Sequence, residues 1–192
     1  MEVKIIKLES SNWPAVYESL KRSNFKPSII NPSEINLINE NDLIIIPGVG
    51  NINSLSSEIE KNFGIANFRK LIIDRKIKVI GICLGFQFLC LSSEEDPSAE
   101  CLGLFKYSVN TIFTPSRPSV GWHRIYTNRP LKYQEIFPQL SNEFFYFTHS
   151  YGVKTTNKFD DDEYIFQYNL SDSNPIVGAI IHKNLIGFQF HP

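Results

Sequence analysis

A chain of 192 residues, 42% hydrophobic and 20% charged, can form one domain with a sizeable core, so we expect a single domain over residues 1–192. The formal net charge of −1 gives no electrostatic basis for binding nucleic acid or a membrane surface, and no apolar run approaches the roughly 18 residues of a membrane span. Three cysteines without a CxxC pair and the absence of a signal-peptide pattern predict no disulfide framework, no metal site and a cytoplasmic location.

The first half of the chain alternates short apolar runs with helical patterns. Predicted strands cover residues 3–8, 28–30, 43–46 and 78–82, and predicted helices cover residues 14–22, 54–63, 65–75 and 86–91. The run at 43–46 is continuously apolar, as is typical of a buried parallel strand, and the Pro-Gly-Val-Gly segment that follows ends it.

Strand candidates dominate the second half, where turn-rich stretches separate them. They cover residues 105–113, 122–126, 144–148, 164–168, 176–182 and 185–190. The acidic run at 160–163 is interpreted as a solvated loop. The two halves together predict an α/β fold with a central, mostly parallel sheet flanked by helices and extended by antiparallel strands.

Cys83 ends a predicted strand within the segment Gly81-Ile82-Cys83-Leu84-Gly85. A glycine two residues after a strand-ending nucleophile makes a sharp strand-to-helix turn, as in the G-x-S-x-G elbow of hydrolases. The N-terminus of the following helix is expected to favour the thiolate. Cys83 is therefore the predicted nucleophile, and the competing interpretation is a small buried hydrophobic residue.

His191 follows the apolar run at 185–190, which would place it at the end of a strand. An imidazole can polarise a thiol and then protonate a leaving group, and the two residues can be distant in sequence. Gly48, Val49 and Gly50 are the candidates for an oxyanion hole, because glycine lets a backbone N–H turn toward a developing negative charge.

Four motifs in this order resemble those of class I glutamine amidotransferases: IPGVG at 46–50, GICLGFQ at 81–87, YFTHSY at 146–151 and GFQFHP at 187–192. With SSEED, CLGLF and VGWHRI, they resemble the glutaminase subunits of imidazole glycerol phosphate synthase, from about residue 42 to the end. The resemblance implies the fold of that class and hydrolysis of L-glutamine through a cysteine thioester without a cofactor. It also implies a heterodimer in which a synthase (cyclase) subunit of histidine biosynthesis receives the ammonia.

The resemblance also implies roles for individual residues. The N–H of Leu84 would be the second oxyanion donor, and Gln87 would help to hold the substrate glutamine. Ser150 and Tyr151 would contact its α-amino and α-carboxylate groups, largely through their backbone. His149, in the same loop, would lie near the glutamine site without acting as the base.

The chain departs from the family pattern in three places. The Glu that follows the catalytic histidine by two residues would be residue 193, so we expect the biological protein to continue past Pro192. Phe86 stands where many relatives carry Met, which we interpret as a packing change. His123 stands where relatives more often carry a small polar residue, and we favour an unremarkable surface position over a contact with a partner.

Three alternatives stay open at this point. A related glutaminase subunit could feed an ATP-dependent sugar amidotransferase in surface-polysaccharide synthesis. The lack of an assignable triad acid is compatible with a non-catalytic partner subunit, although Cys83 and His191 are both intact. A cysteine hydrolase or peptidase could also use the same type of sheet.

Overall fold

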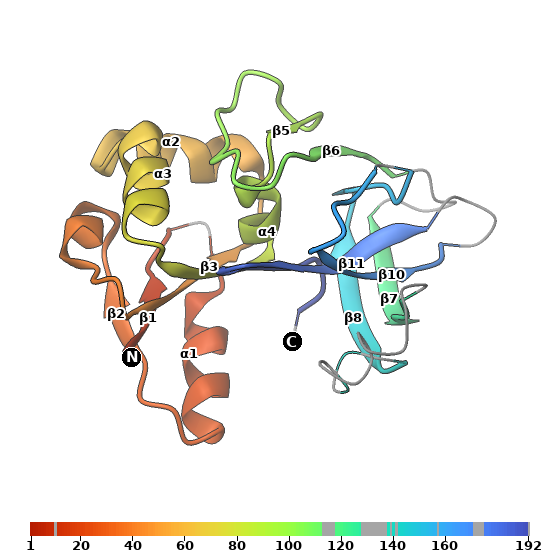
Figure 1. Ribbon diagram of the computed structural model, residues 1–192, viewed down its shortest axis with the longest axis horizontal. Coiled ribbons are helices and arrows are strands. Elements are labelled where there is room, and N and C mark those ends of the chain that lie inside the picture. Colours follow the sequence, from red (N-terminus) through yellow and green to blue (C-terminus); the bar gives the residue numbers. More distant parts are fainter. Residues whose placement is uncertain are drawn as a thin grey trace.

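The computed structural model describes residues 1–9, 11–112, 118–127, 138, 140, 142–156, 158–170 and 175–191. Its central sheet is formed by β1 (Val3–Ile6), β2 (Ser28–Ile30), β3 (Leu43–Gly48), β4 (Lys78–Cys83), β10 (Tyr164–Tyr168), β11 (Ile176–His182) and β12 (Leu185–Phe188). The strand order is β10-β11-β12-β4-β3-β1-β2 (Figure 1). Strands β2, β1, β3, β4 and β12 pair in parallel, whereas β11 and β10 extend the sheet in antiparallel fashion. The predicted architecture is therefore confirmed.

Helices cover both faces of this sheet. Helix α1 (Trp13–Arg22) lies on one face, and α2 (Ile52–Asn62), α3 (Ile65–Asp74) and α4 (Leu84–Leu89) lie on the other (Figure 1). A 3₁₀ helix at Pro32–Leu37 was not predicted from the sequence. None of the helices in the described ranges is long and apolar enough to cross a membrane.

The continuous apolar run of β3 is explained by these two layers. Successive side chains of a strand point to opposite faces of the sheet. Ile44 and Ile46 accordingly pack in the core under α2 to α4, while Ile45 packs with residues of α1. Because both faces are covered, no position of the run needs a polar side chain.

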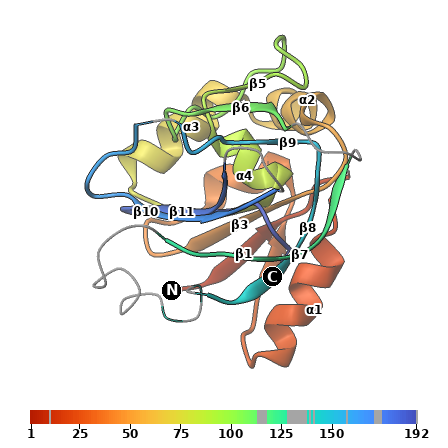
Figure 2. The same ribbon diagram turned by 90° about the vertical axis from the view of Figure 1, so that its right-hand side faces the viewer.

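Two smaller sheets complete the fold: a three-stranded one over the face of the central sheet that carries α2 to α4, and a two-stranded one beside its antiparallel end (Figure 2). Strands β5 (Ser92–Ser93), β6 (Ser108–Thr111) and β9 (Tyr151–Gly152) form one of them. Strands β7 (Ser119–Arg124) and β8 (Phe144–His149) form an antiparallel ribbon. A second core, rich in aromatic side chains such as Phe147, Tyr168 and Phe190, joins the ribbon to β10 and β11.

Several strand bounds predicted from the sequence are wrong. The strand expected at 105–113 is confined to Ser108–Thr111 among the described residues, and residue 113 lies outside them. The strand expected at 185–190 ends at Phe188, two residues before the predicted end.

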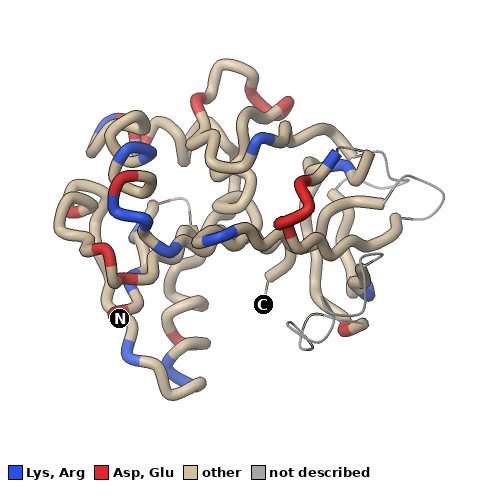
Figure 3. Tube along the Cα trace, viewed as in Figure 1, with Lys and Arg blue, Asp and Glu red and all other residues tan. Residues whose placement is uncertain are grey.

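The acidic segment at 160–163 is only partly solvated. Acidic and basic residues are interspersed along the chain (Figure 3). Asp160 in this segment pairs with Lys106 at 2.5 Å. Glu163, however, is 2% exposed, and its carboxylate accepts hydrogen bonds from the Tyr107 hydroxyl and the Asp160 N–H. These two donors compensate for its burial, which a charge pattern alone does not reveal.

Candidate active site

Cys83 sits at a strained backbone position between strand β4 and helix α4. Its φ of 53° and ψ of −109° lie in a region that residues other than glycine rarely occupy. The strand ends on Cys83 and the helix begins at the next residue, Leu84. This is the geometry of a nucleophile elbow, as predicted from the spacing of Gly81, Cys83 and Gly85.

Two glycines allow this elbow to form against the sheet. A Cβ on Gly85 would lie 1.9 Å from the carbonyl oxygen of Ile46 in the neighbouring strand. A Cβ on Gly81 would lie 2.7 Å from the Cα of Phe86. The helix therefore packs backbone to backbone on β3 and β4, which fixes the height of the Cys83 sulfur above the strand ends.

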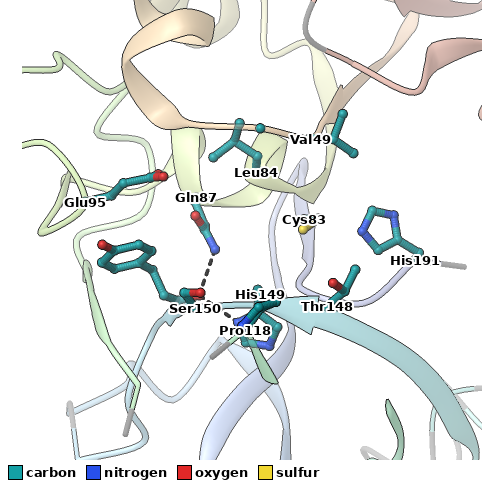
Figure 4. A pocket seen from close by; sticks show the side chains of 12 residues that line it. Val49, Cys83, Leu84, Gln87, Glu95, Pro118, Thr148, His149, Ser150 and His191 are labelled. Atoms are coloured by element: carbon teal, nitrogen blue, oxygen red, sulfur yellow. Dashed lines mark hydrogen bonds between the residues drawn. The ribbon is translucent and has the colours of Figure 1, made fainter. Parts of the chain in front are cut away.

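The elbow opens into a cavity of about 290 Å³ at the carboxyl ends of the parallel strands, which is where ligands bind in such sheets. Nine of the ten predicted site residues line it (Figure 4). They are Val49, Gly50, Cys83, Leu84, Gln87, His149, Ser150, Tyr151 and His191. The tenth, Gly48, pairs in register with Cys83 but lines the neighbouring groove between α1 and the sheet.

The Cys83 thiol is held in its neutral form. Burial raises its pKa to about 11, and the hydrogen bonds from the Leu84 N–H and the Gln189 amide only partly offset this effect. The backbone N–H at the start of the helix does favour the thiolate, as expected, but the burial of the sulfur was not anticipated from the sequence. The Leu84 N–H acts in the expected direction, but α4 has six residues, and desolvation of the sulfur outweighs it.

His191 faces the same cavity as Cys83 (Figure 4). Burial lowers the pKa of its imidazole, so the ring is neutral near pH 7 and can accept a proton. Its backbone N–H donates to the carbonyl of Tyr146 at 3.0 Å, which ties it to β8 instead of leaving it at a strand end. Among the described residues, no hydrogen bond joins the imidazole to the Cys83 thiol.

His149 is buried and has both ring nitrogens engaged. Its Nδ1 lies 2.7 Å from the carbonyl oxygen of Tyr151, and its Nε2 lies 2.5 Å from the hydroxyl of Tyr168. Burial lowers its pKa to about 4, which keeps the ring neutral. His149 shapes the cavity through Tyr151, and no ring nitrogen is left to act as a base, as expected, or to contact a substrate.

Three residues that sequence reasoning did not assign also line the cavity: Glu95, Pro118 and Thr148. Glu95 is the carboxylate among them, and one of its oxygens accepts the N–H of Ile52 at 3.0 Å, whereas no donor from the described residues reaches the other. The SSEED segment, which carried part of the resemblance, contains Glu95, so the sequence marked the segment but did not indicate a role for this residue. Within the described ranges no group of three or more His, Cys, Asp or Glu residues is placed to hold a metal ion.

The other residues singled out in the sequence, His123, Phe86, Cys90 and Cys101, do not line the cavity. His123 is half-buried, and its ring packs on Phe147 and Tyr168 with centroid distances of 5.7 and 5.2 Å, so it occupies the expected surface position only in part. Phe86 is 1% exposed and packs edge-on against Phe105, in agreement with a packing change. All three cysteines are buried and unpaired.

The fold and this cavity define a glutamine amidotransferase. The family model described as glutamine amidotransferase class-I matches residues 5–192, so the chain belongs to that family. It is 30% identical to imidazole glycerol phosphate synthase subunit HisH of Methanopyrus kandleri, over 100% of this chain and 90% of that protein. It is 29% identical to the same subunit of Thermotoga maritima, over 100% of this chain and 89% of that protein.

Solved structures support the fold. A crystal structure of a glutamine amidotransferase superposes with a TM-score of 0.74 at 14% identity, covering 100% of this chain and 90% of that one. The structure of PurLQS from Thermotoga maritima gives a TM-score of 0.66 at 21% identity, covering 100% of this chain and 87% of that one.

Proposed function

We propose that the chain, as a single domain over residues 1–192, is the glutaminase subunit of an imidazole glycerol phosphate synthase in histidine biosynthesis. It hydrolyses L-glutamine and delivers ammonia to a cyclase subunit in a heterodimer. The observation that carries this proposal is the elbow at Cys83, which opens with His191 into one small cavity. The similarity to HisH subunits over the full chain supports this partner over a sugar amidotransferase. Three unpaired cysteines fit the reducing cytoplasm.

In the first chemical step, the Cys83 thiol transfers its proton to the neutral imidazole of His191, and the sulfur attacks the amide carbon of glutamine. The N–H of Leu84 and the N–H groups of Val49 and Gly50 are the donors for the resulting oxyanion. The C–N bond then breaks as the imidazolium protonates the departing nitrogen. The products of this step are ammonia and a γ-glutamyl thioester on Cys83.

In the second step, the thioester is hydrolysed. His191 takes a proton from a water molecule, and the resulting hydroxide attacks the thioester carbon. The C–S bond breaks, the proton returns to the sulfur of Cys83, and glutamate is released. The chain thus needs no cofactor for either step, because all protons pass between the thiol, the imidazole and water.

The cavity also explains selection of a free amino acid. The Glu95 carboxylate can bind the α-ammonium group of glutamine, and Gln87 can accept a hydrogen bond through its side-chain oxygen, which no donor reaches among the described residues. Ser150 lies across the cavity from Val49 and Leu84 (Figure 4). A volume of about 290 Å³ suits one amino acid better than a peptide, which disfavours a peptidase.

Three features of the site favour a resting state in the chain by itself. The thiol is 7% exposed, its pKa is raised to about 11 by burial, and it is not hydrogen-bonded to His191 among the described contacts. We therefore expect docking of the synthase subunit to activate the site by reorienting the oxyanion segment at Val49 and Gly50. Such gating would prevent release of ammonia in the absence of its acceptor.

One face of the ribbon is suited to this partner. Its exposed side chains are Val120, Trp122, Phe144 and Tyr146, with exposures of 54%, 68%, 60% and 36%. Exposed aromatic clusters of this kind mark protein interfaces. The carbonyl of Tyr146 accepts the backbone N–H of His191, so a partner bound to this face contacts the residue that holds the catalytic histidine.

The experiment that tests the proposal measures glutamine hydrolysis by the chain with and without a candidate cyclase subunit. We expect low activity alone and a large increase in the complex. Strong partner-independent hydrolysis would favour a stand-alone glutaminase. No hydrolysis in any complex would instead support the non-catalytic alternative, and activation by a sugar amidotransferase alone would change the assigned partner.

A further inference from the structure

A second buried glutamine contacts the nucleophile directly. Gln189, which follows β12 and is 0% exposed, places its Nε2 3.7 Å from the Cys83 sulfur. Its Oε1 lies 3.1 Å from the Nε2 of Gln87, and that same Nε2 lies 2.8 Å from the carbonyl oxygen of Tyr151. An uninterrupted hydrogen-bond path therefore runs from the backbone of β9 to the reacting sulfur.

The Tyr151 carbonyl fixes the direction of every hydrogen bond in this path. A carbonyl oxygen can only accept, so the Gln87 atom that faces it must be the NH₂ group. The other hydrogen of that group points to Gln189, which must turn its oxygen toward Gln87. The NH₂ group of Gln189 is then left facing the sulfur of Cys83. The amide cannot flip without placing two donors or two acceptors against each other.

At the other end of the path, at the Tyr151 carbonyl, the directions of the hydrogen bonds are fixed as well. The Tyr151 carbonyl also faces Nδ1 of His149, so the proton of that neutral ring is on Nδ1. The Nε2 of His149 then accepts from the hydroxyl of Tyr168, a residue with 0% exposure in the second core. The carbonyl is thus held by two donors and by the packing of a large aromatic side chain, which gives Gln87 a rigid anchor.

We propose that Gln189 is a further catalytic residue, whose side-chain N–H donates to the sulfur of Cys83 and stabilises the thiolate, and that Gln87 positions it. The inference rests on the proposed function, in which this sulfur is the attacking atom. A buried thiolate needs such donors, because water does not solvate it. The other donor is the Leu84 N–H, which sits on the helix side of the sulfur.

The same contact directs the thiol proton. With the NH₂ group of Gln189 facing the sulfur, the S–H hydrogen has no acceptor on that side. His191 shares the cavity with Cys83, and burial keeps its imidazole neutral, so it can accept this proton. Gln189 therefore favours transfer of the proton to the imidazole and holds the sulfur during attack.

The test measures alkylation of Cys83 by iodoacetamide in the full chain, with the modified peptide quantified by mass spectrometry between about pH 7 and 9. Gln189→Met keeps the length of the side chain and removes the donor. Loss of a hydrogen bond to a charged group reduces the thiolate fraction by about 10- to 100-fold, and the higher nucleophilicity of the less stabilised thiolate recovers part of this. We expect alkylation to be about three- to tenfold slower in Gln189→Met at each pH.

The matched control is Gln167→Met, because Gln167 is also a buried glutamine but does not line the cavity. Its alkylation rate should equal that of the wild type. A second variant, Gln87→Met, keeps the donor of Gln189 but removes its anchor, and it should slow alkylation to a smaller extent. If Gln189→Met does not fold, this second variant decides the question.

A rate for Gln189→Met within about 1.5-fold of the wild-type rate would overturn the inference, as would an equal slowing in Gln167→Met. An alkylation rate in Gln87→Met equal to that of the wild type would also overturn the inference. Iodoacetamide requires neither glutamine nor a partner subunit. Slowed alkylation in a chain that never hydrolyses glutamine would therefore refute the proposed function while leaving the donor contact intact.

Discussion

Gly85→Ala is the substitution with the largest expected local distortion in the active site. The new Cβ would lie 1.9 Å from the carbonyl oxygen of Ile46, whereas carbon and oxygen atoms in such contacts approach to about 3.3 Å. Helix α4 or strand β3 must therefore move by roughly 1.4 Å. This shift displaces Cys83 and the Leu84 N–H, which flank the start of the helix.

The expected consequences are a lower free energy of unfolding, by about 1–3 kcal/mol as for other overpacked cores, and a fall in glutaminase rate on the order of 100-fold, as for a displacement of about 1 Å in an active site. Urea unfolding and glutamine hydrolysis in the complex with the synthase subunit provide the two measurements. The matched control is Gly178→Ala, where the nearest atom is the side-chain Cγ2 of Ile125 at 3.0 Å.

The control should keep most of its activity and lose less stability, because a side chain can yield where a backbone carbonyl cannot. A Gly85→Ala variant with the wild-type rate and unfolding midpoint would refute the reasoning. It would show that α4 can retreat from β3 without moving the nucleophile.

Three further predictions concern different parts of the molecule. Asp42→Asn should lower the free energy of unfolding by about 1–3 kcal/mol near pH 7, because it leaves Lys4, 2.9 Å away and 8% exposed, without its partner. Burial opposes ionisation of Asp42, but the hydrogen bond from the Asn39 N–H and the Lys4 ammonium outweigh burial and lower the pKa of Asp42. In urea unfolding of the wild type, the stabilisation by the Asp42–Lys4 pair should therefore be complete above about pH 3.9 and should be lost as the pH falls through the lowered pKa. Glu95→Gln should raise the KM for glutamine by about 10- to 100-fold with a smaller change in kcat, since it removes the carboxylate available to the α-ammonium group; an unchanged KM would remove this residue from the substrate site. Trp122→Ala should weaken binding of the synthase subunit by at least about tenfold in calorimetric titration while leaving the rate at saturating partner unchanged, and equal affinity would place the interface elsewhere.

Much of the fold could be predicted because its signals are local. The apolar runs of β3 and β4 are continuous because helices cover both sheet faces, and the glycines around Cys83 mark the elbow directly. The carboxyl ends of parallel strands meet at one edge, so residues following β3 and β4 could be expected to share a site. The structure places Val49, Cys83 and Leu84 there.

The rest depends on tertiary neighbours that a linear pattern does not contain. Gln189 lies within an apolar segment and resembles an ordinary strand residue until its amide is placed beside the sulfur of Cys83. Glu95 lies in a polar loop among other acids, and only folding brings it to the cavity. The raised pKa of Cys83 could not be predicted, because the helix N-terminus is visible in the sequence and the depth of burial is not.

The most direct test of the central claim compares two ammonia sources in the complex of Cys83→Ala with the synthase subunit. The substitution removes only a sulfur atom, so the fold and the subunit contact should be retained. Glutamine hydrolysis and glutamine-dependent synthesis should fall to background, while synthesis from added ammonium should match that of the wild-type complex. Glutamine hydrolysis by Cys83→Ala at close to the wild-type rate would show that another residue attacks the amide and would contradict the account.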